Sequence, residues 1–252
     1  MTQHLTLLTG GSRGMGLALA RQLLQPTRFL LCIARHAHPT LAAEAAALGA
    51  PLEQWQQDLA EPEAAAQRLA QWLQAQPAGR FASATLINNA GVIPPIAPLS
   101  ASAPADLARA LRVGLEAPML LSAVFLGATE GWNVPRKVLN ISSGLGRRPM
   151  ASQAAYCAAK AGMDHFTRCL ALDEALKPHG ARVCSLAPGV IDTEMQGQLR
   201  STDAQQFPDA PQFAQLQQQG QLSSPEAAAA RVLAWLARDD FGQAPVADVR
   251  QD

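Results

Sequence analysis

The chain alternates short apolar runs with longer segments in which apolar residues recur every three or four positions. Several short runs are apolar at every position, which is typical of parallel strands covered on both faces. The seven strands expected on this basis cover residues 4–9, 28–34, 52–57, 83–89, 137–142, 181–187 and 245–249. Helical periodicity marks the segments between them, such as 16–25 and 105–128. This alternation predicts one α/β domain over residues 1–252, a doubly wound seven-stranded parallel sheet with helices on both faces.

The C-terminal third contains one segment that breaks this pattern. Residues 194–222 are polar and glutamine-rich and show no strand pattern. A connection this long in a compact domain is usually a functional lid or carries short helices of its own. It follows the sixth strand, at the edge where such sheets bind ligands, so we expect a substrate lid at about 190–222. A surface insertion without function is the alternative. The last helix then begins after Ser224, a suitable N-cap, with Pro225 in its first turn.

Composition excludes several classes of function. Apolar residues make up 48% of the chain, and 20 Lys and Arg balance 20 Asp and Glu. A net charge of zero argues against nucleic acid or an anionic membrane as partner. The chain contains no run of about 18 apolar residues, so no transmembrane helix is expected. Its first residues also lack the features of a signal peptide. The four cysteines have no metal-binding spacing, so we expect free thiols, a cytoplasmic protein and no metal site.

A glycine-rich turn follows the first strand and opens the first helix. Its sequence is TGGSRGMG, Thr9 to Gly16. Gly10, Gly14 and Gly16 let the backbone turn tightly and approach a phosphate, which then lies at the helix N-terminus. This placement predicts dinucleotide binding.

The end of the second strand indicates which dinucleotide is bound. An NAD site would offer Asp or Glu there to the ribose hydroxyls, whereas this strand ends in Ala34 and Arg35. Arg35, with Arg13 of the glycine turn, would pair with a 2′-phosphate through charge-assisted hydrogen bonds. We therefore predict NADP(H); the alternative is that both arginines only face solvent.

Tyr156, the only tyrosine, stands four residues before Lys160, one of three lysines. On a helix the two side chains share a face. Four more motifs lie just past the ends of predicted strands: Asp58-Leu59, Asn88 to Gly91, Asn140 to Ser143 and Pro188 to Thr193. The carboxyl ends of parallel strands meet at one edge, so these motifs are expected to form a single site.

The motifs TGxxxGxG, NNAG, Ser, YxxxK and PGxxxT occur in the order typical of short-chain dehydrogenases/reductases, and the chain resembles that family over essentially its whole length. LINNAG, AYCAAKAGMDHFTR, APGVIDTEMQ and RSTDAQQF are further similar to the branch of sepiapterin reductases and bacterial benzil reductases. The resemblance implies a Rossmann fold and an NADPH-dependent reductase of a ketone, a benzil-like diketone or a pterin side-chain carbonyl. The open alternatives are another short-chain alcohol dehydrogenase or 3-oxoacyl reductase, and a non-catalytic NADP-binding sensor.

The resemblance also assigns roles to residues. Ser143, Tyr156 and Lys160 are the expected catalytic group. Ser143 is preferred to Ser142 because it lies thirteen residues before Tyr156, the family's separation. Tyr156 would give the proton that a newly formed alkoxide needs, with its phenol pKa lowered by nearby positive charge. The expected cofactor contacts are Gly10, Ser12, Arg13, Gly14, Met15, Gly16, Arg35, Asp58, Leu59, Asn88, Ala90, Gly91, Tyr156, Lys160, Pro188, Gly189, Ile191 and Thr193.

Three further expectations follow from the family. The family usually has an asparagine in its fourth helix, where this chain has Gly114, so the proton relay to Lys160 is expected to be altered. Met195, an apolar residue of the lid segment, and Asp248 are candidate substrate contacts, although Met195 could equally be a packing residue and Asp248 a surface residue ending the last strand. Family members associate through their fourth and fifth helices, so we expect a homodimer or homotetramer, with residues 154–176 facing the partner.

Overall fold

Seven parallel strands form one sheet in the computed structural model, which describes residues 3–77 and 79–250. The ends of the expected domain, residues 1–2 and 251–252, lie outside the described residues. The strand order is β3-β2-β1-β4-β5-β6-β7. Their bounds are β1 Gln3–Thr9, β2 Arg28–Ala34, β3 Leu52–Gln56, β4 Phe81–Asn88, β5 Arg136–Ile141, β6 Arg182–Ala187 and β7 Val246–Asp248. The predicted doubly wound parallel sheet is confirmed.

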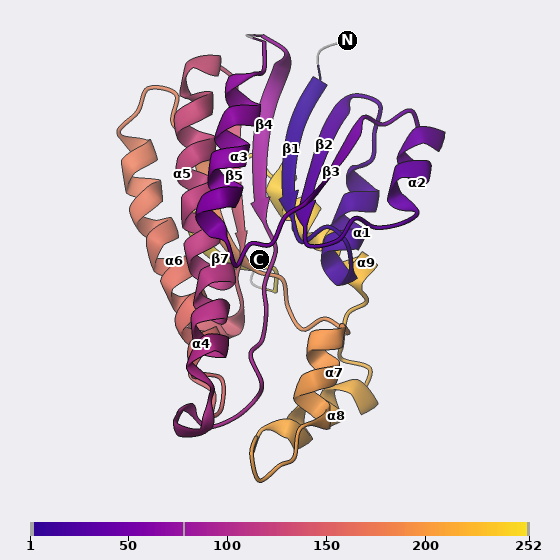
Figure 1. Cartoon of the computed structure of the whole chain (residues 1–252), viewed down its shortest axis with the longest axis vertical. Helices are drawn as coiled ribbons and strands as arrows, with labels where there is room; N and C mark the ends of the chain where they lie inside the picture. The colour runs from indigo at the N-terminus through magenta and orange to yellow at the C-terminus, as the bar shows by residue number, and fades with distance from the viewer. Residues whose placement is uncertain (1–2, 78, 251–252) are drawn as a thin grey trace.

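Helices cover both faces of this sheet (Figure 1). The bounds are α1 Gly14–Leu23, α2 Leu41–Ala47, α3 Pro62–Gln74, α4 Pro104–Leu111, α5 Ala117–Thr129, α6 Ala154–Ala175, α7 Glu194–Ser201, α8 Ala210–Gln218 and α9 Pro225–Ala237. Helices α1 and α9 pack together and bury one apolar cluster, and α3 and α5 pack together over another. The expected N-cap of α9 is confirmed, since the Ser224 side chain accepts a hydrogen bond from the backbone N–H of Ala227.

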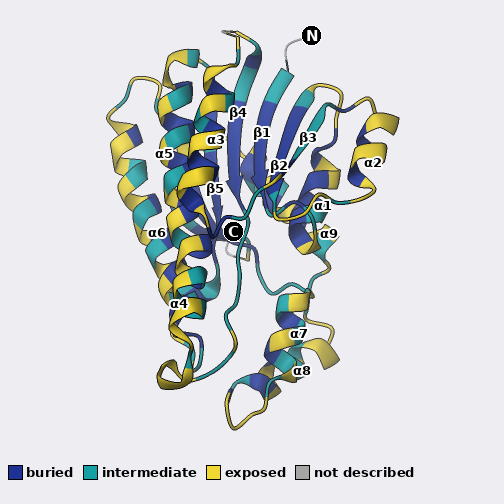
Figure 2. Cartoon of the chain, viewed as in Figure 1, coloured by how far each residue is buried: buried dark blue, intermediate teal, exposed yellow. Residues whose placement is uncertain are grey.

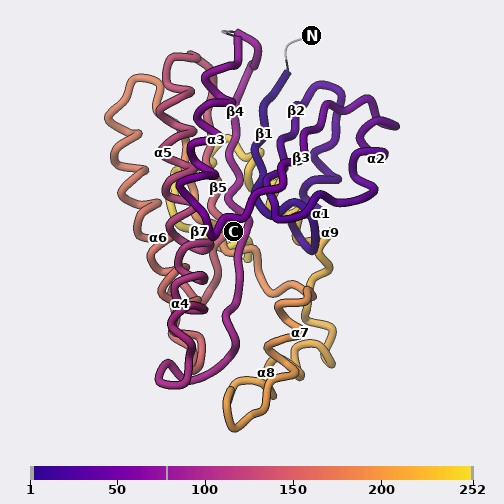
Figure 3. Tube along the Cα trace, viewed as in Figure 1, coloured from indigo at the N-terminus to yellow at the C-terminus, as the bar shows by residue number. Residues whose placement is uncertain are grey.

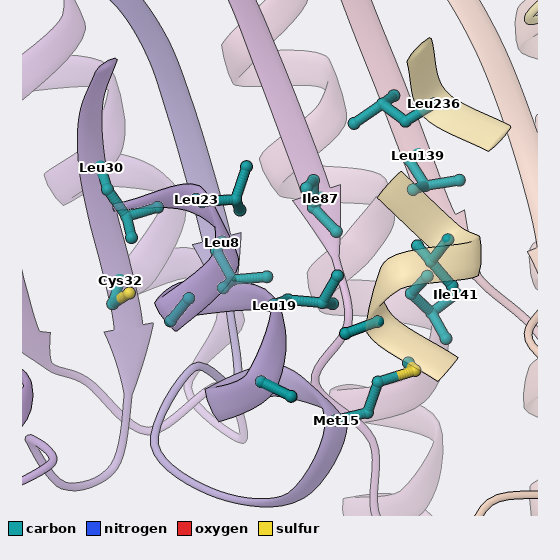
Figure 4. Close-up of a cluster of buried hydrophobic side chains, with 14 of the residues drawn as sticks. Leu8, Met15, Leu19, Leu23, Leu30, Cys32, Ile87, Leu139, Ile141 and Leu236 are labelled. Atoms are coloured by element: carbon teal, nitrogen blue, oxygen red, sulfur yellow. The ribbon is translucent and has the colours of Figure 1, made fainter. Parts of the chain in front are cut away.

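The apolar pattern of the strands follows from this double cover. In β1, Leu5 and Leu7 belong to the cluster under α3 and α5, whereas Leu8 belongs to the cluster under α1 and α9. Figure 4 shows Leu8 beside Leu19 of α1, with Ile87 of the neighbouring strand β4. Each fully buried leucine contributes about 1.5–3 kcal/mol to folding. The strands are accordingly the most completely buried part of the chain (Figure 2).

The predicted helical run 105–128 is interrupted at its centre. Helix α4 passes through a π-helical turn, Arg112–Glu116, before α5 begins, and Gly114 lies in that turn. The whole run, Pro104–Trp132, is long and apolar enough to cross a membrane, although no such helix was expected from the sequence. Half of its most apolar window is buried inside the fold, and it packs against α3 and α6, as the core helix of an α/β domain does.

The polar segment after β6 folds into the two helices α7 and α8. Figure 3 shows the chain leaving the carboxyl ends of the strands, forming these helices and returning to α9. The segment has a small core of its own, in which the rings of Phe207 and Phe213 stack with centroids 5.6 Å apart. Ile93, Ile96 and Met150 pack against this core from outside the segment. The segment is therefore folded, and it packs against loops at the carboxyl edge of the sheet.

Candidate active site

One cavity of about 490 Å³ runs along the carboxyl edge of the sheet. Its lining comes from the chain just after β1, β2, β3, β4, β5, β6 and β7, and from α6 and α7. The strand order places the residues after β2 and β3 at one end and those after β5, β6 and β7 at the other. We call these the adenosine end and the catalytic end. The topology alone therefore separates the motifs into two groups within one cavity.

The glycine turn has no room for side chains at two positions. Gly10 has φ +71°, and a Cβ there would lie 2.9 Å from the Ala90 Cα. A Cβ on Gly16 would lie 2.0 Å from the carbonyl oxygen of Gly10. The first turn of α1 is thus packed directly on the loop that precedes it, which leaves the backbone N–H groups at the helix start facing the cavity.

Hydrogen bonds tie the NNAG motif to this turn. The Thr9 hydroxyl accepts from the backbone N–H groups of Asn89 and Ala90 at 2.9 and 3.0 Å. The Asn89 amide donates to the carbonyl oxygens of Thr9 and Gly10 at 3.0 and 3.3 Å. The ends of β1 and β4 are therefore fixed to each other at the centre of the cavity.

The adenosine end is basic. Arg35 lines it, and Asp58 forms an ion pair of 3.1 Å with Arg109 of α4. Burial alone would raise the pKa of the Asp58 carboxyl, but a hydrogen bond from the Ala60 N–H and the charges of Arg109 and Arg35 lower it overall. This carboxyl is therefore ionised and already paired, so Arg35 remains exposed toward the cavity.

Tyr156 and Ser143 meet at the catalytic end. Ser143 stands just after β5 and Tyr156 in the first turn of α6. Burial raises the pKa of the Tyr156 phenol above its ordinary value, and a hydrogen bond with Ser143 opposes the rise only in part. The lowering expected from nearby positive charge is therefore not found, because burial disfavours the phenolate and outweighs the hydrogen bond with Ser143. The phenol is protonated at neutral pH, which is the form that can donate a proton.

Lys160 lies one turn further along α6 and is 4% exposed. Its ammonium donates to the carbonyl oxygen of Ile141 at 2.7 Å and lies 5.8 Å from the centroid of the Tyr156 ring. Burial lowers the pKa of this group to about 8, against an opposing contribution from Asp164. The ammonium is thus held near the phenol, close enough to its neutral form to exchange a proton near physiological pH.

Gly114 contacts the helix that carries these residues. A Cβ at this position would lie 3.0 Å from the Cβ of Ala159, the residue before Lys160. Gly114 is buried, and its absent side chain lets the π-helical turn approach α6 closely. An asparagine would need the two helices to move apart, so packing explains the glycine at this position.

The cavity brings together all but two of the expected site residues. Those that line it are Gly10, Ser12, Arg13, Gly14, Met15, Gly16, Arg35, Asp58, Leu59, Ala90, Gly91, Ser143, Tyr156, Lys160, Pro188, Gly189, Ile191, Thr193 and Met195. Asn88 does not line it: its buried amide donates to Asn140 at 2.8 Å and to Ser122 at 3.1 Å, beneath the cavity floor. Asp248 does not line it either, because its carboxylate is bound by Arg250.

Sequence reasoning missed several residues of the lining, among them Asn89, Arg109, Arg148 and Arg250. Asn89 had a usable signal, because it belongs to the NNAG motif. Arg250 lies in the turn after β7, outside the predicted strand, and Arg109 and Arg148 are placed by tertiary contacts that no local pattern records.

The residues present fit a dinucleotide. The glycine turn leaves backbone donors and no side chains where a pyrophosphate would lie, and a Cβ on Gly91 would point toward the Lys160 ammonium at 3.9 Å. The hydroxyl of Ser142 is buried, lines the cavity and has no hydrogen-bond partner among the described residues. A ligand with polar groups in the centre of the cavity would satisfy it.

Known proteins are similar to this chain in sequence and in fold. Benzil reductase ((S)-benzoin forming) of Bacillus cereus is 32% identical over 240 residues, which are 95% of this chain and 96% of that protein. Sepiapterin reductase of Xenopus laevis is 34% identical over 204 residues, 76% and 74% of the two chains. A metagenomic short-chain oxidoreductase solved in complex with NADP has a TM-score of 0.73 at 27% identity, covering 98% of this chain and 95% of that one.

These relatives confirm the expected likeness to the benzil and sepiapterin reductase branch. The family model for short chain dehydrogenases matches residues 4–204, most of the chain and nearly all of the sheet. With a dinucleotide cavity that ends at a serine, a tyrosine and a lysine, this chain belongs to the short-chain dehydrogenase family of oxidoreductases.

Proposed function

We propose that the protein is an NADPH-dependent carbonyl reductase that acts on a ketone, a benzil-like diketone or a pterin side-chain carbonyl. One observation carries the proposal: Ser143, Tyr156 and Lys160 converge at the end of the cavity that begins at the glycine turn. When bound, the dinucleotide supplies the hydride that reduces the carbonyl carbon. The chain itself then has to hold the carbonyl oxygen and deliver one proton to it.

Tyr156 delivers that proton. Its raised pKa keeps the phenol protonated at neutral pH, and the Ser143 hydroxyl within hydrogen-bonding reach can hold the same substrate oxygen. Lys160, bound to the carbonyl oxygen of Ile141, places a positive charge beside the phenolate that remains after transfer. These features favour the reduction direction, because oxidation would need the phenolate at the start.

The arginines at the adenosine end support a preference for NADPH. Arg13 and Arg35 line the cavity, and the carboxylates beside them, Glu194 and Asp58, are paired with Arg13 and Arg109. Strand β2 ends at Ala34, so it offers no carboxylate to a ribose 2′-hydroxyl. A 2′-phosphate would meet guanidinium groups there.

The test measures the oxidation of NADPH with benzil, 1-phenyl-1,2-propanedione and sepiapterin. Wild type should turn over at least one of them, and Tyr156→Phe, which keeps the ring and removes only the hydroxyl, should lose at least about 100-fold in kcat, the usual size of a proton-transfer contribution. Undiminished turnover in Tyr156→Phe would remove the mechanism. Equal kcat/KM for NADPH and NADH would remove the cofactor preference.

We also propose a homodimer or homotetramer in the cytoplasm. Leu172 of α6 and Leu176, the residue that caps its C-terminus, support the assembly, since they are 71% and 87% exposed. The four cysteines are free thiols, as in a reducing compartment. Light scattering on the wild type and on a Leu172→Glu, Leu176→Glu double variant tests the interface: an unchanged mass in the variant would place it elsewhere.

A further inference from the structure

The catalytic end of the cavity is lined by cations. Arg148 follows β5, Arg250 follows β7, and both line the cavity with Lys160. Among the described residues, the carboxylates that line the cavity are Asp58 and Glu194, and each is paired with an arginine. A substrate at this end therefore meets hydrogen-bond donors with positive charge and, in the described part of the lining, no free carboxylate.

Arg250 is fixed in place by a buried carboxylate. Asp248 accepts from the Arg250 Nε at 2.8 Å, from its Nη2 at 2.6 Å and from its backbone N–H at 3.0 Å. The Asp248 side chain is 4% exposed, whereas that of Arg250 is 60% exposed. A planar guanidinium held at two points by a buried partner has a defined direction, which distinguishes it from a free surface arginine.

A second arginine anchors the carboxylate from below. Arg147 lies 3.9 Å from Asp248 and 3.2 Å from Asp164, and it donates to the carbonyl oxygen of Ala247 at 2.7 Å. Asp164 is also bound by the Ser185 hydroxyl at 2.6 Å. The Asp248 carboxylate is therefore occupied by Arg250, lies near a second guanidinium and does not line the cavity. The group that the pair presents to the cavity is a donor.

Arg250 lies next to the residues that hold the reacting carbonyl. Its Nη2 lies 4.0 Å from the position that a Cβ on Gly144 would occupy, one residue after Ser143. Its Cδ lies at the same distance from the corresponding position on Gly189, in the loop after β6. A guanidinium carries five N–H donors, and the two that bind Asp248 leave three that can reach another acceptor.

We propose that Arg250 determines substrate specificity by binding an oxygen on the carbon adjacent to the reacting carbonyl. The preferred substrates are then 1,2-dicarbonyl compounds, in which the second oxygen belongs to a ketone or a carboxylate. This inference rests on the proposed reductase function. One oxygen is held by Ser143 and Tyr156, and the other accepts a hydrogen bond from Arg250, while Asp248 acts as the positioning residue for the guanidinium. An amino-bearing ring such as a pterin gains nothing from this arrangement, because it would need an acceptor at Asp248.

The experiment compares three substrates that differ at the second oxygen. Benzil has a ketone there, benzoylformate has a carboxylate, and deoxybenzoin has a methylene group. Kinetics with NADPH are measured for wild type, Arg250→Leu, Arg250→Gln and Arg148→Leu, with Arg21→Leu, an arginine on the remote part of α1, as the control. Circular dichroism and Tm verify folding; should the leucine variant not fold, Arg250→Gln decides, because it keeps a polar side chain.

Wild type should prefer the two dicarbonyl compounds to deoxybenzoin. Arg250→Leu should lower kcat/KM for both by about ten-fold or more, as for a lost hydrogen bond to a charged group, and leave deoxybenzoin within about two-fold. Arg250→Gln should retain part of the activity on benzil and lose that on benzoylformate, since it donates without a charge. Equal losses on all three substrates, no loss, or the same pattern in Arg148→Leu would overturn the assignment. A wild-type enzyme that reduces none of the three would instead count against the proposed function.

Discussion

Lys160 gives the sharpest test of the electrostatics of the site. Its ammonium is almost completely buried, and burial lowers the pKa from 10.5 to about 8. At about 1.36 kcal/mol per pKa unit, this difference of about 2.5 means that the charged group destabilises the folded protein by about 3 kcal/mol. The perturbation that removes the charge and keeps the length is Lys160→Met.

The penalty depends on pH in a defined direction. Below pH 8 both the folded and the unfolded chain carry the proton, so the full penalty is present. Between pH 8 and 10.5 the folded protein loses the proton first, and the penalty falls as pH rises. From these values it decreases from about 3 kcal/mol at pH 7 to about 1 kcal/mol at pH 9.5.

Lys160→Met should therefore be more stable than wild type at pH 7, although inactive. It also loses the hydrogen bond to the Ile141 carbonyl oxygen, which costs about 1–2 kcal/mol, so the net gain at pH 7 is about 1–2 kcal/mol. Urea unfolding of the cofactor-free protein, followed by tryptophan fluorescence at pH 6.5 to 9.5, measures the free energy of unfolding of both proteins. The difference between them should shrink by about 2 kcal/mol over the interval from pH 7 to pH 9.5.

Lys177→Met is the matched control, because the pKa of Lys177 is shifted in the opposite direction to that of Lys160. Hydrogen bonds from Lys177 to Glu174 and Glu130 raise the pKa of this lysine, so its removal should cost stability throughout the same pH range. Titrating groups common to the wild type and a variant cancel in the difference. A difference for Lys160→Met that stays constant or grows between pH 7 and 9.5 would refute the claim that burial depresses the Lys160 pKa.

Three further predictions concern the ends of the cavity. Arg35→Leu should raise the KM for NADPH about ten-fold and leave that for NADH unchanged in steady-state assays, as for a lost contact to a charged group; a parallel rise for both would contradict the role of Arg35. Glu194→Gln should lower the KM for NADPH by up to about five-fold, because an exposed pair with Arg13 is worth at most about 1 kcal/mol; no change would show that Glu194 does not compete for Arg13. Phe207→Ala removes the fully buried ring that stacks on Phe213, and it should expose α7 and α8 to hydrogen exchange and proteolysis while the sheet stays protected; uniform loss of protection would mean that the segment folds with the sheet.

The sheet was predictable because helices cover both of its faces, and strands buried on both faces are rich in apolar residues. Leu5, Leu7 and Leu8 are buried on opposite faces of β1, so the strand carries no polar alternation. The order of motifs along the chain then sufficed to place Ser143 and Tyr156 in one cavity, because all parallel strands end at the same edge.

The two expected site residues that do not line the cavity show what such patterns lack. Asn88 and Asn89 are neighbours at the end of β4, and consecutive side chains of a strand point to opposite sides. Which of the two side chains faces the cavity depends on how β4 is oriented where it ends. The hydrogen bond between Asn88 and Asn140 of β5 turns the Asn88 side chain away from the cavity. Asp248 was left open between a substrate contact and a surface residue, and it is neither: it is 3% exposed and bound by Arg250, with Arg147 from the loop between β5 and α6 at 3.9 Å.

The reason for a glycine at position 114 is seen only in the structure. From the sequence it was a gap in the expected proton relay. In the structure it is the point where the π-helical turn meets Ala159, and a Cβ there would lie 3.0 Å from the Ala159 Cβ, so one side would have to shift. A methyl group at position 114 would push against the residue that precedes Lys160, so the closeness of the two helices and the position of the catalytic lysine depend on the same contact.

The net charge of the chain does not describe how charge is distributed within the fold. A chain with 20 basic and 20 acidic residues offers no reason to expect an anionic ligand. Yet the described lining of its cavity combines two carboxylates, both paired, with the arginines Arg13, Arg35, Arg109, Arg148 and Arg250. Balanced composition and a locally positive cavity are compatible because the compensating carboxylates lie elsewhere or, like Asp248, are buried behind the arginine that they orient. Under the proposed function, such a field suits a phosphorylated dinucleotide at one end and an oxygen-rich substrate at the other, where the direction of Arg250 is set by the Asp248 carboxylate.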